Sequence, residues 1–207
     1  TTFSIDNDIA GSNLKTLWFD SRFYRMNILW ENGTLRIRDI HLFNETFPSI
    51  YETQVATSNE CSFFTLPFVD GYIWSKPNQI AGLRLKAILD GKEVALEGKD
   101  PKFIKTGTSE MHISWPLTTV DGTFEIDLSE KQVKMKLSAT KPVSWFFDLN
   151  TAEKVQLPFD TISTKTITCS FENMRYQVKA EKGAFSKPAN GSVLRISPLS
   201  NDLILSF

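Results

Sequence analysis

The stretch YRMNILWENGTLRIRDIHLF, which spans residues 24–43, alternates large apolar side chains with polar ones on both sides of a central Asn-Gly dipeptide. In its first half four of the five apolar residues share one parity, namely Tyr24, Met26, Ile28 and Trp30, and Leu29 has the other parity with Arg25 and Asn27. Alternation with a period of two is typical of a strand with one buried face. Because Asn-Gly between two such runs is the strongest short signal for a tight turn, we expect a hairpin that turns at Asn32-Gly33.

The returning half of this hairpin changes phase. Leu35 and Ile37 have one parity, whereas Ile40 and Leu42 have the other. One extra residue in a strand shifts every later side chain to the opposite face. The pattern therefore predicts a β-bulge near residues 38–39.

Similar alternating runs recur to the end of the chain, and Asp90-Gly91 and Asp121-Gly122 are two further turn signals. Many short strands with turns between them are typical of an antiparallel sandwich. A chain of 207 residues can form one such unit, because all-β domains commonly reach ~200–250 residues. We expect an all-β fold, an antiparallel β-sandwich of the supersandwich or jelly-roll kind with little or no helix, in a single domain over residues 1–207.

The composition excludes several classes of function. The net charge of −1 comes from interleaved acidic and basic residues, so the concentrated basic surface that binds nucleic acid is not expected. No apolar run approaches the ~18–20 residues of a membrane-spanning helix. The glycines occur singly and no His-x-His or Cys-x-x-Cys motif is present, so we expect neither a nucleotide cofactor nor a metal ion.

Cys61 and Cys169 are the two cysteines of the chain. A disulfide between them would close a very long loop and restrict the unfolded chain by about 4–5 kcal/mol. Two buried free thiols are the alternative, which we favour slightly because free cysteine packs like a small apolar residue.

The stretch TLPFVDGYIWSK, residues 65–76, is the main candidate site. If it continues as one strand, alternation places Phe68, Asp70, Tyr72 and Trp74 on the same face. An unpaired carboxylate is costly in a core, whereas aromatic rings beside a carboxylate suit the apolar faces and hydroxyl groups of a sugar. The other tryptophans are assigned to the core: Trp18, Trp30, Trp115 and Trp145. We therefore expect ligand binding by Asp70, Tyr72 and Trp74, aided by Arg38 and His41.

The sequence offers few candidates for catalytic residues. His41 and His112 are the only histidines, and no nucleophile-elbow motif accompanies them. Glu125 and Asp127 share one face of a predicted strand and could act as paired carboxylates, although a solvated face is the favoured reading. Catalytic residues therefore stay unknown. Arg36 and Arg38 could hold an anion or simply line the wet side of a sheet.

Three segments together resemble a known kind of protein: residues 35–43, residues 66–75 and the closing run from Tyr176 to Leu205. The first two are similar to the large β-sandwich domains of bacterial glycan-utilisation proteins of the Bacteroides type, and the third is similar to the final strands of galactose-mutarotase-like supersandwiches. This resemblance implies a periplasmic or secreted protein that acts on or beside polysaccharide. It also implies paired histidines and a glutamate in the cleft of an active enzyme, and this chain departs from that pattern because its two histidines are far apart in sequence.

The leading hypothesis is thus a non-catalytic, carbohydrate-associated domain that binds or positions a glycan. One alternative is a sugar-active enzyme of the epimerase or glycosidase type that uses His112 or His41 with Glu125 or Asp127. Another is a structural module whose aromatic surface meets a further domain or subunit.

Overall fold

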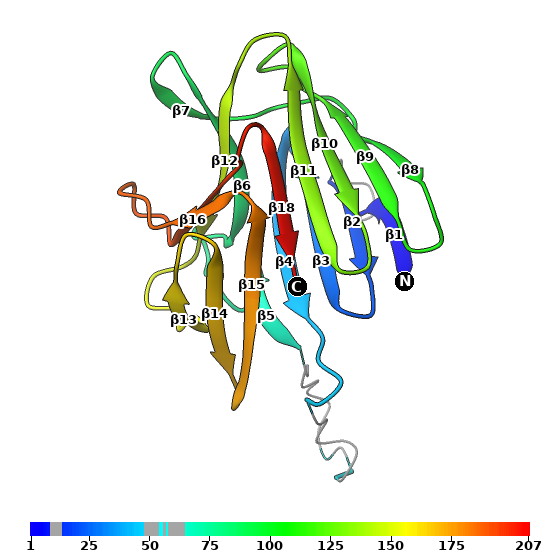
Figure 1. Cartoon of the computed structure of the whole chain (residues 1–207), viewed down its shortest axis with the longest axis vertical. Coiled ribbons are helices and arrows are strands. Elements are labelled where there is room, and N and C mark those ends of the chain that lie inside the picture. The colour runs from blue at the N-terminus through cyan, green and yellow to red at the C-terminus, as the bar shows by residue number, and fades with distance from the viewer. Residues whose placement is uncertain (9–13, 48–53, 56, 58–64) are drawn as a thin grey trace.

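The computed structural model describes residues 1–8, 14–47, 54–55, 57 and 65–207, which form two antiparallel sheets and no helix (Figure 1). The first sheet contains ten strands: β1 (Thr2–Asn7), β2 (Lys15–Asp20), β3 (Tyr24–Glu31), β4 (Thr34–Leu42), β5 (Leu66–Asp70), β6 (Gly82–Leu89), β7 (Lys92–Ala95), β12 (Ser144–Asn150), β16 (Ala184–Ser186) and β17 (Leu194–Ser197). The second contains eight: β8 (Lys102–Lys105), β9 (Met111–Pro116), β10 (Gly122–Leu128), β11 (Gln132–Ala139), β13 (Phe159–Ile162), β14 (Thr166–Phe171), β15 (Met174–Lys182) and β18 (Asp202–Ser206).

The two sheets pack face to face over one contiguous apolar core. Each contributes the inward-pointing half of its alternating strands, so β9 buries Met111, Ile113 and Trp115 while the residues between them face outward. Across the interface, Phe124 of β10 meets Trp145 of β12 edge-on, with ring centroids 5.0 Å apart. Such edge-to-face contacts stabilise a core beyond the area they bury. The predicted all-β sandwich is confirmed.

The hairpin of β3 and β4 forms as its sequence predicts. Asn32 and Gly33 both have positive φ angles, 51° and 75°, as a tight hairpin turn requires. Along the pair, Asn27 lies opposite Asp39, whereas Ile28 lies opposite Ile37. Residue 38 is therefore the extra residue of a bulge in β4, which confirms the position that the change of phase indicated.

Strand β4 has two different neighbours on its far side. Its first half pairs with β6, where Ile37 lies opposite Leu83, and its second half pairs with β5, where Asp39 lies opposite Asp70. Because β5 and β6 run antiparallel to the same strand, the chain leaves the sheet after β5 and re-enters it at β6. Residues 71–81 form this excursion, which we call the 71–81 loop.

In the part of the chain that the structure describes, no helix has the length and apolar character needed to cross a membrane. Cys169 is a free cysteine buried on β14, and burial raises the pKa of its thiol to about 12. Cys61 lies outside the described residues.

Candidate ligand-binding groove

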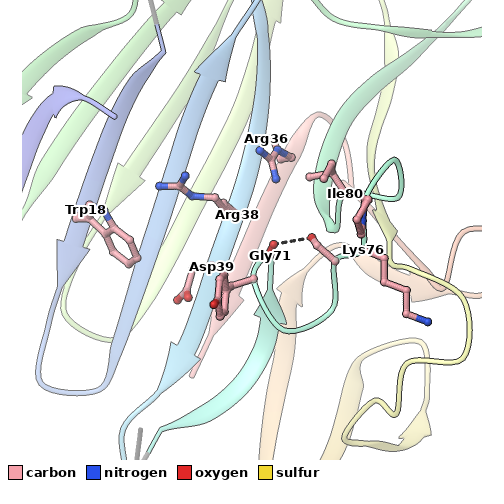
Figure 2. A pocket seen from close by; sticks show the side chains of 10 residues that line it. Trp18, Arg36, Arg38, Asp39, Gly71, Lys76 and Ile80 are labelled. Carbon is pink, nitrogen blue, oxygen red and sulfur yellow. Dashed lines mark hydrogen bonds between the residues drawn. The ribbon is translucent and has the colours of Figure 1, made fainter. Parts of the chain in front are cut away.

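The 71–81 loop is held in place by its own short hydrogen bonds. Asp70, the last residue of β5, accepts the backbone amides of Tyr72 and Ile73 at 2.9 and 2.7 Å, which turns the chain out of the sheet. Ser75 donates to the carbonyl of Gly71, a bond drawn in Figure 2. It also accepts the amide of Ala81, so it ties the two ends of the loop together. The loop is thus a fixed wall beside the outer face of the first sheet.

Two glycines let this wall approach the arginines of β4. A β-carbon on Gly71 would lie 2.5 Å from the carbonyl oxygen of Arg38. A β-carbon on Gly82, where φ is 141°, would lie 2.9 Å from Cγ of Arg36. Neither distance is tolerated between such atoms, so close packing of the loop against the stems of both arginines depends on glycine.

Between this wall and β2 lies a groove of about 530 Å3, a size within the range of small-molecule sites. It is lined by Trp18, Arg36, Arg38, Asp39, Gly71, Tyr72, Ser75, Lys76, Pro77 and Ile80. Figure 2 shows Trp18 on one side and Ile80 on the other, with Arg36 and Arg38 between them.

Two aromatic rings line the groove. Tyr72 is 90% exposed at the start of the loop, and Trp18 is half-buried on β2. The guanidinium of Arg25 lies 5.9 Å from the Trp18 ring centroid, within the range of a cation–π contact. Trp18 is therefore partly anchored, while both rings offer flat apolar surface to a ligand.

The floor of the groove is charged. Arg38 forms a two-bond ion pair with Asp8, at 2.8 and 2.9 Å, and donates through Nε to Asn27 at 2.6 Å. The hydrogen bonds from Arg38 lower the pKa of Asp8 and outweigh the opposing effect of its partial burial. Arg25 holds Asp39 in a second two-bond pair, at 2.9 and 3.0 Å. These pairs orient polar atoms on the groove floor before any ligand arrives.

Behind the groove, His41 and Asp70 form a buried polar cluster. Nδ1 of His41 lies 2.7 Å from Oγ1 of Thr65, and Nε2 lies 3.3 Å from Oδ2 of Asp70 without the alignment of a hydrogen bond. Burial alone would raise the pKa of Asp70. The neighbouring His41 and the hydrogen bonds from the backbone amides of Ile73 and Tyr72 outweigh burial and lower this pKa. Among the described residues no group of three His, Cys, Asp or Glu side chains is arranged to hold a metal ion.

The five predicted site residues separate into two groups. Arg38 and Tyr72 line the groove. Asp70, His41 and Trp74 are buried, at 4%, 5% and 3% exposure, and do not line it.

The expectation that Tyr72 and Trp74 share one face is wrong, because β5 ends at Asp70 and alternation does not continue into the turn that follows. Trp74 instead joins the core, edge-on to Phe159 of β13 with ring centroids 6.0 Å apart. It cannot stack on a ligand from that position.

The assignment of Trp18 to the core is also wrong. Its neighbours Leu17 and Phe19 are both fully buried, so alternation along β2 directs the Trp18 side chain to the outer face. That signal was present in the sequence. The remaining three tryptophans, Trp30, Trp115 and Trp145, do lie in the core.

The candidate catalytic residues lie elsewhere. On the outer face of the second sheet, His112 lies opposite Asp127, and its Nδ1 is 2.7 Å from Oδ1 of that residue. Glu125 shares this face and accepts a hydrogen bond from Ser138. His41 belongs to the first sheet, so the two histidines lie on opposite sides of the sandwich and do not form a common cleft.

No family model matches the chain, and neither a curated protein nor a solved structure matches it.

Proposed function

We propose that the protein binds a glycan in the groove between Trp18 and the 71–81 loop, as a non-catalytic carbohydrate-binding domain. The observation that carries this proposal is the arrangement of two aromatic rings, the exposed Tyr72 and the half-buried Trp18, around a floor of fixed charged groups. Flat rings stack on the C–H faces of sugars, and pre-oriented polar groups hydrogen-bond their hydroxyls. Because the groove is open, it also suits an internal segment of a long polysaccharide chain.

A binding role is favoured over hydrolysis by the carboxylates of the groove. Glycoside hydrolysis needs two carboxyl groups that flank the scissile bond. Asp39 is the one carboxylate among the described lining residues, and Arg25 occupies both of its oxygens. This arrangement fixes a hydrogen-bond acceptor in place, and the described lining of the groove supplies no second carboxylate to flank a scissile bond.

The test is a titration of the protein against a panel of polysaccharides by affinity electrophoresis, with Trp18→Ala and Tyr72→Ala beside the parent chain. Each substitution should weaken binding about five- to tenfold, because each removes one stacking surface worth ~1–1.5 kcal/mol. Both side chains lie outside the core, so the fold should persist.

Ile73→Ala is the matched control, because Ile73 is an exposed apolar residue of the same loop that does not line the groove. Its affinity should equal that of the parent chain. Unchanged binding in both aromatic variants would remove the groove from consideration. An equal loss in the Ile73 variant would indicate a general apolar docking surface instead.

A further inference from the structure

Two arginines are cross-strand neighbours at one end of the groove, and one of them, Arg36, belongs to the groove lining. Arg36 of β4 lies directly opposite Arg84 of β6 in the strand register, so both side chains start from the same face of the sheet. Direct cross-strand neighbours have β-carbons about 4.5–5.5 Å apart, and like charges in such pairs are destabilising. The sheet therefore places two positive charges together and needs negative charge nearby.

The described residues supply little of that negative charge. Arg36 donates from Nη1 to the carbonyl of Ala81 at 3.0 Å, and Arg84 donates to the carbonyl of Ile80 at 3.2 Å, but neither carbonyl carries a net charge. The nearest carboxylate belongs to Glu31, whose Oε2 is 3.8 Å from Nη2 of Arg36. Asp8 adds a weaker attraction to Arg36, and Asp148, directly opposite Arg84 on β12, is already held by Arg195 and Lys86.

Two other arginines of the same face each form a two-bond ion pair with a carboxylate. Arg38 has two short bonds to Asp8, and Arg25 has two to Asp39. Arg36 has no such partner in the described part of the chain, and its buried Nε has no acceptor there. The Arg36 guanidinium therefore lies at the groove with one carboxylate at 3.8 Å and no two-bond partner among the described residues.

Electrostatics agree with this geometry. Burial lowers the pKa of Arg36, the neighbouring Arg84 lowers it further, and Glu31 does not offset the two effects. Burial also lowers the pKa of Arg84, against a weaker opposing effect of Glu31. Guanidinium groups stay protonated in proteins. The repulsion between Arg36 and Arg84 is therefore offset by a bound anion rather than by loss of a proton.

The two ends of the groove differ in their hydrogen-bonding groups. Arg36 and Asp39 lie on either side of Arg38 in Figure 2, so one end of the floor donates hydrogen bonds and the other accepts them. The fork of a guanidinium matches the two oxygens of a carboxylate or a sulfate. We propose that the groove selects saccharides that carry an anionic group, either a uronic acid carboxylate or a sulfate ester, and that this group binds beside Arg36 and Arg84.

This inference rests on the proposed glycan-binding function, and its test uses pairs of ligands that differ only in charge. Oligosaccharides of polygalacturonate are compared with their methyl esters, and those of a sulfated galactan with the unsulfated galactan. The acidic member of at least one pair should bind about tenfold more tightly than its neutral counterpart, as one charge-assisted contact allows. That preference should weaken as salt is added. The pair that shows it identifies the anion.

Arg84→Gln is the decisive variant, because Arg84 is only half-buried and its loss leaves the Arg36 contact with Ala81 intact. It should abolish most of the preference for the acidic member. Arg175→Gln makes the same change of charge at an exposed position of β15, on the other sheet, and should leave the preference unchanged.

The possible failures are distinguishable. Equal affinity for acidic and neutral members, with binding still lost in Trp18→Ala, would overturn the inference and leave the proposed function standing. Equal effects of Arg84→Gln and Arg175→Gln would also overturn it, in favour of diffuse attraction. Binding of no member of either pair would overturn the inference, while binding of another polysaccharide of the panel that is lost in Trp18→Ala would leave the proposed function standing.

Discussion

The backbone amide of Gly71 donates to the carbonyl oxygen of Arg38 across 2.7 Å, and this bond fixes the start of the 71–81 loop against the bulge of β4. A β-carbon on Gly71 would lie 2.5 Å from the same oxygen and 2.7 Å from Cγ of Arg38. One wall of the groove and one of its floor arginines are therefore positioned by a single contact that only glycine permits.

Gly71→Ala should destabilise the protein by about 1–3 kcal/mol, because the loop must move away from Arg38 to admit the methyl group. Glycan affinity should fall in parallel, since Tyr72 follows directly after the displaced residue. Chemical denaturation and ligand titration of the same sample measure both effects.

Gly107→Ala is the matched control for this substitution. The nearest atom to its added β-carbon is a carboxylate oxygen of Glu110, 3.4 Å away on a flexible side chain. We expect a change in stability of less than about 0.5 kcal/mol there. A tolerated Gly71→Ala variant with normal affinity would show that the loop position does not control the groove.

The tryptophans should respond differently to substitution. Trp74→Ala removes a buried ring that packs on Phe159, so it should cost about 3–5 kcal/mol of stability. Trp18→Ala should cost much less, because its ring is half-buried outside the core. Acrylamide quenching of tryptophan fluorescence checks the same difference, since Trp18 should account for most of the accessible emission. Quenching that persists unchanged in Trp18→Phe would contradict this assignment.

Local patterns predicted local structure well. Asn32-Gly33 has the left-handed backbone that its hairpin needs, and the change of phase predicted the bulge near residues 38–39, where the strand register places it at Arg38. Both signals lie within a few residues of the structure they specify. The same reasoning failed at residues 72–74, because alternation applies only while a strand continues, and Asp70-Gly71 is itself a turn signal that ends β5.

The groove could not be assembled from local patterns, because it depends on pairing between distant segments. Arg36 and Arg84 meet only because β6 follows β5 along the same side of β4, with the 71–81 loop between them. Alternation assigns each side chain to a face but does not identify which strands are neighbours. Arg36 could be recognised as a possible anion ligand from the sequence, but its pairing with a second arginine could not.

Asp148 should make stability depend on pH. Its side chain is fully buried on β12 and accepts hydrogen bonds from Arg195, Asn190 and Lys86. Burial alone would raise the pKa of Asp148, but these bonds outweigh it and hold the pKa below the usual value of 3.8. The unfolded chain then takes up the proton more readily, so this stabilisation is present above about pH 4 and is lost as the pH falls below the depressed pKa.

Asp148→Asn should therefore cost about 3 kcal/mol at pH 7, where it leaves Arg195 and Lys86 short of negative charge. The difference from the parent chain should shrink at pH 3. Asp127→Asn, at an exposed carboxylate of β10, serves as the control and should change stability little at either pH. Urea denaturation at the two pH values gives the comparison, and a difference that does not vary with pH would contradict the role of Asp148.

Asp70 distinguishes a residue that builds the groove from one that contacts the ligand. Asp70→Ala removes the acceptor for the amides of Tyr72 and Ile73, so it should cost about 1–3 kcal/mol and weaken glycan binding by releasing the loop. Asp70→Asn keeps an oxygen for both amides and removes only the charge beside His41.

We expect the asparagine variant to retain most of the stability of the parent chain and to bind glycan with the same affinity, because Asp70 is buried behind the groove. Denaturation and titration of both variants separate the two roles. If Asp70→Asn lost glycan binding while its stability stayed unchanged, the carboxylate itself would have to reach the ligand, as the pattern of rings and carboxylate in residues 65–76 first suggested.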